Sequence, residues 1–241
     1  MQTTKSAKAT QVTNKRRLSF SGYEWTVKAG ASLGPGPNRW EAANVNLDTA
    51  GRLRLRIRKE ADSGWSCAEV GLTQQRLGFG LYEFQTIGPI GQLDPNVVLG
   101  LFNYPPPDVG TDTTNEIDIE YARWGNARSM IGNFTLWTAR KGEKSVSHTF
   151  AVPTDIEQAT HRFLWLPDRI VWQALRGHAK DTRDNRGEFA GWEFKPPAGS
   201  GLIPQQPLPV LVNLWLFQGK APMDGKEVVI PLARFTHQPR P

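Results

Sequence analysis

The sequence lacks both a long apolar run that could span a membrane and a pair of cysteines that could form a disulfide. It contains a single cysteine, Cys67, so no disulfide can form within the chain. No apolar run approaches the roughly 18 residues of a membrane-spanning helix, so no membrane partner is expected. The first residues also lack the apolar core of a signal peptide. At 241 residues, one domain can bury a sufficient core without disulfides.

Acidic side chains are absent from residues 1–17, which carry five of the 29 lysines and arginines. The other residues hold 24 basic and 23 acidic side chains, so most of the net charge of +6 comes from this segment. A short basic segment with few large apolar residues is typical of a disordered terminus. We therefore expect a tail at 1–17, a single domain at 18–241 and no nucleic-acid partner. DNA binding by the tail is the alternative.

Helical periodicity is also scarce, and only residues 153–161 (PTDIEQATH) read as a short helical turn. Residues 52–59 (RLRLRIRK) instead alternate aliphatic and basic side chains, the period of a half-buried strand. Because no β–α–β alternation is present, the pattern predicts an antiparallel sandwich or barrel. Further short strands, rich in β-branched and aromatic residues, are predicted at residues 80–87, 96–104, 115–121, 131–138, 146–152, 161–167, 169–175, 208–217 and 226–235.

The segment NEIDIEY (115–121) carries Glu116, Asp118 and Glu120 at alternate positions. In a strand these carboxylates share one face, and the intervening isoleucines share the other. Carboxylates this close repel one another and raise at least one pKa, which costs stability unless a function requires it. A straight strand presents its oxygens in a row, which suits a metal ion poorly. Paired carboxyls suit retaining glycoside hydrolysis, with an exposed acidic strand as the alternative.

Other predicted strands repeat one arrangement, with polar and aromatic side chains on one face and mostly apolar ones on the other. Aromatic rings offer flat apolar surfaces to sugar rings, and Asn or Glu side chains pair with hydroxyls. A core aromatic is the better reading of any single tryptophan, but recurrence beside the acidic triplet favours a carbohydrate cleft. The residues of these faces are Glu83, Gln85, Phe102, Tyr104, Asn133, Thr135, Trp137, Leu211, Asn213, Trp215 and Phe217.

Taken together, these segments resemble family 16 glycoside hydrolases, the β-jelly-roll enzymes of the lichenase, laminarinase and xyloglucan-transferase type. NEIDIE is similar to the catalytic strand of that family, and its uninterrupted ExDxE spacing is similar to the lichenase branch. The resemblance covers roughly residues 20–237 in matching order. The other similar segments are NRWEAANVNLDTAGRLRLRI (38–57), QRLGFGLYEFQT (75–86), HRFLWLPDRIVWQALRG (161–177) and LPVLVNLWLF (208–217).

The resemblance implies an all-β, concanavalin A-like sandwich of two antiparallel sheets with a cleft on the concave sheet. It implies a nucleophile at Glu116, a general acid/base at Glu120 and an assisting acid at Asp118. The substrate-binding residues that it implies are Asn38, Glu83, Phe102, Tyr104, Trp137, Asn213 and Trp215. No cofactor is expected for catalysis, and a structural calcium held largely by backbone oxygens is a further family feature. We expect a monomer that is exported, because polymeric glucans lie outside the cell.

The function that follows is an endo-β-glucanase acting on β-1,3/β-1,4-linked glucan by double displacement. Two alternatives stay open: a transglycosylase acting on β-glucan or xyloglucan, and a non-catalytic glycan-binding sandwich. The chain departs from the family just before the motif, where an aromatic residue and Asp are replaced by Thr114 and Asn115. The resemblance also implies a tryptophan that stacks near the scissile sugar, which is absent here, and Trp124 is the candidate to substitute for it from nearby. This departure affects the choice of glucan most.

Overall fold

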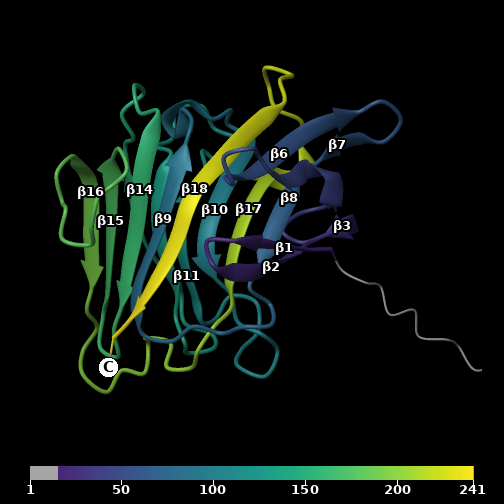
Figure 1. The fold of residues 1–241 in the computed structure, drawn as a ribbon. Helices are drawn as coiled ribbons and strands as arrows, with labels where there is room; N and C mark the ends of the chain where they lie inside the picture. Colours follow the sequence, from purple (N-terminus) through teal and green to yellow (C-terminus); the bar gives the residue numbers. More distant parts are fainter. Residues whose placement is uncertain (1–15, 241) are drawn as a thin grey trace, which may run out of the picture.

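The computed structural model describes residues 16–240, and within them short strands account for nearly all regular structure (Figure 1). One sheet contains β1 (Arg17–Phe20), β2 (Tyr23–Val27), β8 (Ala68–Gly71), β10 (Val97–Asn103), β11 (Glu116–Tyr121), β12 (Gly132–Trp137), β13 (Val146–Phe150) and β17 (Val210–Leu216). The other contains β5 (Val45–Leu47), β6 (Leu53–Glu60), β7 (Gly64–Ser66), β9 (Gly80–Ile87), β14 (Gln158–Trp165), β15 (Ile170–Arg176), β16 (Glu188–Phe194) and β18 (Val228–Pro239).

The remaining elements are small. Strands β3 (Gly30–Leu33) and β4 (Asn38–Trp40) form a two-stranded ribbon. Three 3-10 helices of one turn each lie at η1 (Ala42–Asn44), η2 (Ile90–Gln92) and η3 (Phe217–Gly219). No helix in the described part of the chain is long and apolar enough to span a membrane.

Both large sheets are antiparallel, and strands distant in sequence lie side by side. The first sheet has the order β1-β2-β8-β17-β10-β11-β12-β13, and the second β16-β15-β14-β9-β18-β6-β5, with β7 beside β6. The sheets lie face to face as two layers (Figure 1). The predicted fold class, an all-β sandwich of two antiparallel sheets, is confirmed.

Alternation along each strand sorts the side chains between the core and the outer faces. In the first sheet, Leu101, Ile117 and Val212 point into the core and are fully buried. In the second, the aliphatic side chains of residues 53–57 do the same, while the arginines between them stay half exposed. The apolar faces of the two sheets therefore pack against each other, and the polar face of the first sheet is left for a ligand.

Two expectations about chain segments need correction. Arg17, placed in the tail by its charge, is the first residue of β1 and pairs with Thr26. Residues 153–161 do not form a helical turn, because β14 begins at Gln158 and Ile156 is buried. Pairing of β14 with β9 and β15 supplies its backbone with hydrogen-bond partners and overrides the weak local preference. The rest of the predicted tail, residues 1–15, lies outside the described residues.

Candidate active site

The three acidic residues of β11 lie on one face of the strand, as the alternation predicts. Ile117 and Ile119 between them are fully buried in the core. Asp118 is only 2% exposed, whereas Glu116 and Glu120 are partly accessible. The two isoleucines thus anchor the strand and present the carboxyls in a row on the outer face of the sheet.

The register of neighbouring strands determines what each carboxyl faces. Glu116 pairs with Trp137 of β12, and Asp118 lies between Phe102 of β10 and Thr135 of β12. Glu120 lies opposite Gly100, which in turn pairs with Asn213 of β17. A Cβ atom on Gly100 would come within 2.5 Å of Asn213 Oδ1, so the absence of a side chain there leaves room for the Asn213 amide.

A cavity of about 520 Å³ opens over these carboxyls. Besides the three acids, it is lined by five of the predicted substrate-binding residues. Its lining residues are Lys28, Gly34, Pro35, Glu69, Phe102, Tyr104, Asp112, Thr113, Glu116, Asp118, Glu120, Trp137, Leu211, Asn213 and Trp215. The structure therefore brings Phe102, Tyr104, Trp137, Asn213 and Trp215 together with the acidic row.

Burial is the main cause of unusual titration in the acidic row. It raises the pKa of Glu120 to about 7, and burial with repulsion from Glu120 raises the pKa of Glu116 to about 8. Burial, together with the charges of both glutamates, raises the pKa of Asp118 as well. The row therefore retains protons near neutral pH, so that an acid and a carboxylate can coexist within it.

Glu69 and Lys28 belong to the cavity although no pattern in the sequence points to them. Glu69 on β8 accepts a hydrogen bond from Asn213 Nδ2 at 3.3 Å and forms an ion pair with Lys28 Nζ at 2.9 Å. Burial raises the pKa of Glu69, and the Lys28 charge opposes that rise. Lys28 itself lies over the Trp40 ring at 4.2 Å. Strand β8 is short and contains small residues, so its pattern did not predict a strand.

The loop between β10 and β11 forms one wall of the cavity. Tyr104 donates a hydrogen bond from its hydroxyl to Asp112. Thr113 and Asn115 have φ angles of 71° and 53°, a region that non-glycine residues rarely adopt. Thr114, which replaces an aromatic residue of the family, is buried and accepts a hydrogen bond from the Thr111 amide. The wall beside Glu116 thus consists of a tyrosine–aspartate pair.

Asn38 does not contact the cavity, contrary to its predicted role. Its side chain is 3% exposed, and Nδ2 donates to the carbonyls of Pro35 at 2.8 Å and Leu216 at 2.9 Å. Its Oδ1 accepts a hydrogen bond from the Cys67 thiol at 3.4 Å. Asn38 therefore holds the turn that contains Pro35 against β17, and it acts on the cavity only through that turn.

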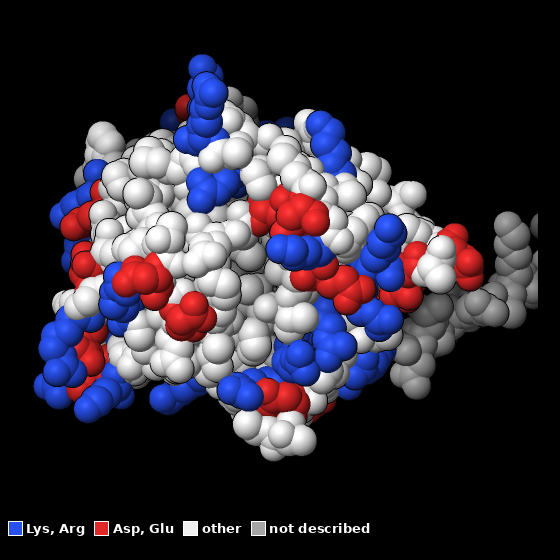
Figure 2. All heavy atoms as spheres, turned by 90° about the horizontal axis from the view of Figure 1, so that it is seen from above, with Lys and Arg blue, Asp and Glu red and all other residues white. Residues whose placement is uncertain are grey.

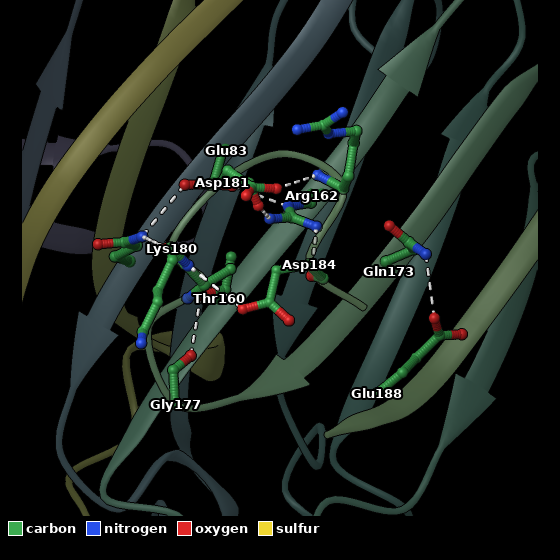
Figure 3. A network of polar contacts seen from close by, with 12 residues as sticks. Glu83, Thr160, Arg162, Gln173, Gly177, Lys180, Asp181, Asp184 and Glu188 are labelled. Atoms are coloured by element: carbon green, nitrogen blue, oxygen red, sulfur yellow. Dashed lines mark hydrogen bonds and ion pairs between the residues drawn. The ribbon is translucent and has the colours of Figure 1, made fainter. Parts of the chain in front are cut away.

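The prediction that Glu83 lines the cleft is also wrong, because β9 belongs to the second sheet. Its carboxylate accepts a hydrogen bond from Arg162 Nε at 2.8 Å on the outer face of that sheet (Figure 3). Arg162 also donates to the carbonyls of Asp181 at 2.7 Å and Asp184 at 3.1 Å. The pair thus fastens a surface loop. A strand's two-residue period cannot reveal which sheet it joins, and this is why Glu83 was misassigned.

The structure also bears on metal binding. Among residues 16–240, no three His, Cys, Asp or Glu side chains come together as a metal site. A calcium ion bound largely by backbone oxygens would leave no such signature, so the structural calcium stays a prediction.

Known β-glucanases are similar to this chain in sequence. No model of a known protein family matches the chain. A β-glucanase of Bacillus licheniformis is 28% identical over 223 residues, covering 90% of this chain and 82% of that protein. A β-glucanase of Bacillus subtilis (strain 168) is 29% identical over 200 residues, covering 81% and 72%.

Solved structures show the same fold. The B. licheniformis β-glucanase superposes with a TM-score of 0.67 at 21% identity, covering 95% of this chain and 100% of that one. A family 16 endo-glucanase from Bacteroides ovatus gives 0.65 at 12% identity, covering 89% and 94%. A Mycobacterium tuberculosis antigen, described as a pseudo β-1,3-glucanase, gives 0.63 at 18% identity, covering 86% and 88%. The lichenase-like family 16 resemblance predicted from the motifs is thus confirmed.

Proposed function

We propose that this protein is a glycoside hydrolase, a retaining endo-β-glucanase acting on β-1,3/β-1,4-linked glucan. The observation that carries the proposal is the row of Glu116, Asp118 and Glu120 on the floor of a cavity with aromatic walls. The substrate class comes from the relatives, which are β-glucanases. Supporting it, a B. ovatus structure of the same fold is described as a mixed-linkage glucan enzyme in complex with a product.

In the first step, the Glu116 carboxylate attacks the anomeric carbon while protonated Glu120 donates its proton to the leaving glycosidic oxygen. In the free protein the pKa of Glu116 is the higher of the two, so the step requires the ionised form of Glu116, which the hydrogen bond from Asp118 favours. This forms a glycosyl ester on Glu116 and releases the reducing-end fragment. In the second step, Glu120 takes a proton from water, which attacks the same carbon and releases Glu116. Two inversions at one carbon leave its configuration unchanged.

Asp118 lies between the two glutamates in β11 and pairs with Phe102 of β10 in the sheet. Its burial keeps it protonated, so it can donate a hydrogen bond to Glu116 while that carboxylate is ionised. When Glu116 becomes an ester, the demand for that hydrogen bond falls. Asp118 is therefore assigned the assisting role of steadying charge on the nucleophile.

Replacing Glu120 with glutamine tests the assignment directly. An amide cannot donate the required proton, so hydrolysis of barley β-glucan should fall about 10²- to 10⁴-fold. The measurement is reducing-end release, with Glu188→Gln on the outer face of the second sheet as the matched control. Undiminished hydrolysis by Glu120→Gln would contradict the proposal. Release of the β-anomer first, observed by proton NMR, checks retention.

A non-catalytic glycan-binding sandwich is the main rival, because a described pseudo-glucanase has the same fold. That rival expects oligosaccharide binding without any reducing-end release from barley glucan, laminarin, xyloglucan or agarose. It also gives no reason for a buried row of three acids, which destabilises a protein that does not use it.

A transglycosylase would use the same carboxyls with a sugar hydroxyl in place of water. Incubation with one pure oligosaccharide separates the two activities. Hydrolysis yields only shorter products, whereas transfer also yields products longer than the starting material.

We further propose that the protein is an exported monomer. Glucan polymers do not cross membranes, so their hydrolysis requires the enzyme outside the cytoplasm.

The surface also supports the absence of a nucleic-acid partner from the proposal. Acidic and basic side chains are interspersed on the face shown in Figure 2, without the uniform basic surface of a nucleic-acid-binding protein. Cell fractionation tests the location, and light scattering at several concentrations tests the monomer.

A further inference from the structure

Trp124 is one of the few large apolar side chains left exposed, with 37% of its surface accessible. It lies in the loop between β11 and β12, directly after the strand that carries the acidic row. Its ring centroid is 6.4 Å from that of Trp215 and 5.6 Å from that of Phe217. Since Trp215 lines the cavity, the aromatic surface continues from the cavity to Trp124.

The register shows at which end of the acidic row this surface lies. Glu120 is level with Gly100 and Asn213, and Trp215 is the next residue of β17 on the same face. Trp124 follows the last residue of β11, so it lies beyond Glu120. Thr114, where the family has an aromatic residue, precedes Glu116 at the other end of the strand. Trp124 therefore does not replace the missing family aromatic.

The loop is built to hold Trp124 in an unfavourable conformation. Trp124 has a φ angle of 53°, which is rare for a bulky residue and strained. Arg123 donates to the carbonyl of Ser129 in the same loop at 2.7 Å and to that of Gly91 in η2 at 3.1 Å. The Gly125 amide donates to the Pro95 carbonyl at 2.9 Å. These bonds keep the indole at the surface instead of letting it join the core.

Two buried polar atoms beside Trp124 have no hydrogen-bond partner among residues 16–240. One is Trp215 Nε1 and the other is Asn96 Oδ1, in side chains that are 7% and 5% exposed. Asn96 lies next to the loop, since a Cβ on Gly125 would be 3.6 Å from its Oδ1. Buried polar groups are nearly always paired, so an indole N–H and an amide oxygen without protein partners mark the packing beneath Trp124 as unusual.

We propose that Trp124 is a stacking platform for an additional sugar unit, extending the cleft beyond Trp215. The ligand is a pyranose of the same β-glucan chain, because the platform is continuous with the cavity. The apolar face of the sugar would lie on the indole, while its hydroxyls remain in water or reach the cleft edge. The inference rests on the proposed function, and it assigns a contribution that only longer oligosaccharides can use.

The test compares Trp124→Ala with wild type on mixed-linkage glucan oligosaccharides of increasing length. The ratio of kcat/KM for a hexasaccharide to kcat/KM for a trisaccharide should fall about tenfold, because one stacking contact is lost. Trp124→Phe should keep part of the ratio. Met130→Ala, which truncates another exposed side chain of the same loop, is the matched control and should leave the ratio unchanged.

An unchanged ratio for Trp124→Ala, in an enzyme that cleaves the hexasaccharide, would overturn the platform and leave the proposed function intact. An equal fall for short and long substrates would also overturn it, since that is the result of a purely structural role. If wild type cleaves no glucan, the proposed function fails. Calorimetric titration of wild type and Trp124→Ala with the hexasaccharide then decides whether Trp124 binds the sugar.

Discussion

At the scale of single residues, Gly100 is a position in the cleft that has no room for a side chain. It lies between Glu120 and Asn213, and a Cβ there would be 2.5 Å from Asn213 Oδ1 and 3.4 Å from Phe102 Cδ1. Asn213 in turn donates a hydrogen bond to Glu69. A methyl group on residue 100 would therefore displace the Asn213 amide, which lies beside the acidic row and donates a hydrogen bond to the Glu69 carboxylate.

Gly100→Ala should lower both stability and activity. Pushing a close-packed neighbour aside costs about 1–3 kcal/mol, and the shifted Asn213 should raise KM for glucan. Chemical denaturation and steady-state kinetics measure the two effects. Gly78→Ala is the matched control, because a Cβ there would meet only Pro207 Cγ at an ordinary 3.8 Å. Equal KM values for Gly100→Ala and wild type would show that Asn213 does not contact the substrate.

At the scale of elements, the ion pair between β9 and β14 supports the fold and not the site. Glu83 and Arg162 are both buried on the outer face of the second sheet, and Arg162 ties down the loop between β15 and β16 (Figure 3). If β9 belonged to the first sheet, the same alternation would place Glu83 in the cleft. Membership of a sheet thus decides whether the same alternating pattern presents a ligand or an internal clamp.

Glu83→Gln should destabilise the protein without raising KM in the folded fraction. Removing one partner of a buried pair leaves the other charge uncompensated, which costs about 3–5 kcal/mol. Urea denaturation measures the loss, and glucan kinetics below the unfolding range measure KM. Glu188→Gln, whose partner Gln173 lies on the same outer face, should change stability by less than about 0.5 kcal/mol. A raised KM for Glu83→Gln alone would restore the subsite role.

At the scale of the whole molecule, burial shifts the pKa values of a core histidine and of the acidic row in opposite directions. His161 of β14 is fully buried and hydrogen-bonded to Thr86 Oγ1 at 2.8 Å and to the Tyr121 hydroxyl at 2.7 Å. It thereby links the second sheet to the strand that carries the acids. Burial lowers the pKa of His161 to about 3, whereas burial raises the pKa values of the acidic row.

Stability should therefore fall on both sides of a mildly acidic optimum. Unfolded histidine has a pKa near 6.5, so below about pH 6.5 the unfolded chain binds one extra proton, which by itself lowers stability by up to about 1.4 kcal/mol for each unit that the pH falls. The three raised carboxyls outweigh this single proton down to about pH 4.3, and only below that pH does the histidine make stability fall as the pH falls. Unfolded glutamate has a pKa near 4.3, so between about pH 4.3 and 8 the folded row retains protons that the unfolded chain releases, and stability falls as the pH rises.

Melting temperatures across this pH range test the balance. Glu116→Gln removes one raised carboxyl, so its Tm should exceed that of wild type at pH 8 and approach it at pH 4. Each kcal/mol corresponds to about 2–4 °C for a chain of this size. Glu193→Gln, an exposed carboxyl of β16, is the control. A constant difference between Glu116→Gln and wild type at all pH values would contradict the proposed titration.

The strand content, the shared face of Glu116, Asp118 and Glu120, and the aromatic faces beside them could all be predicted from the sequence. Those features follow from the two-residue period of a strand, which is local. The assignment of Glu83 to the opposite sheet and the supporting role of the buried Asn38 come from the three-dimensional fold. The fold also brings Glu69 and Lys28 into the cavity and places Trp124 next to Trp215. Strand order and sheet membership depend on pairing between residues far apart in the chain, and no local pattern encodes that pairing.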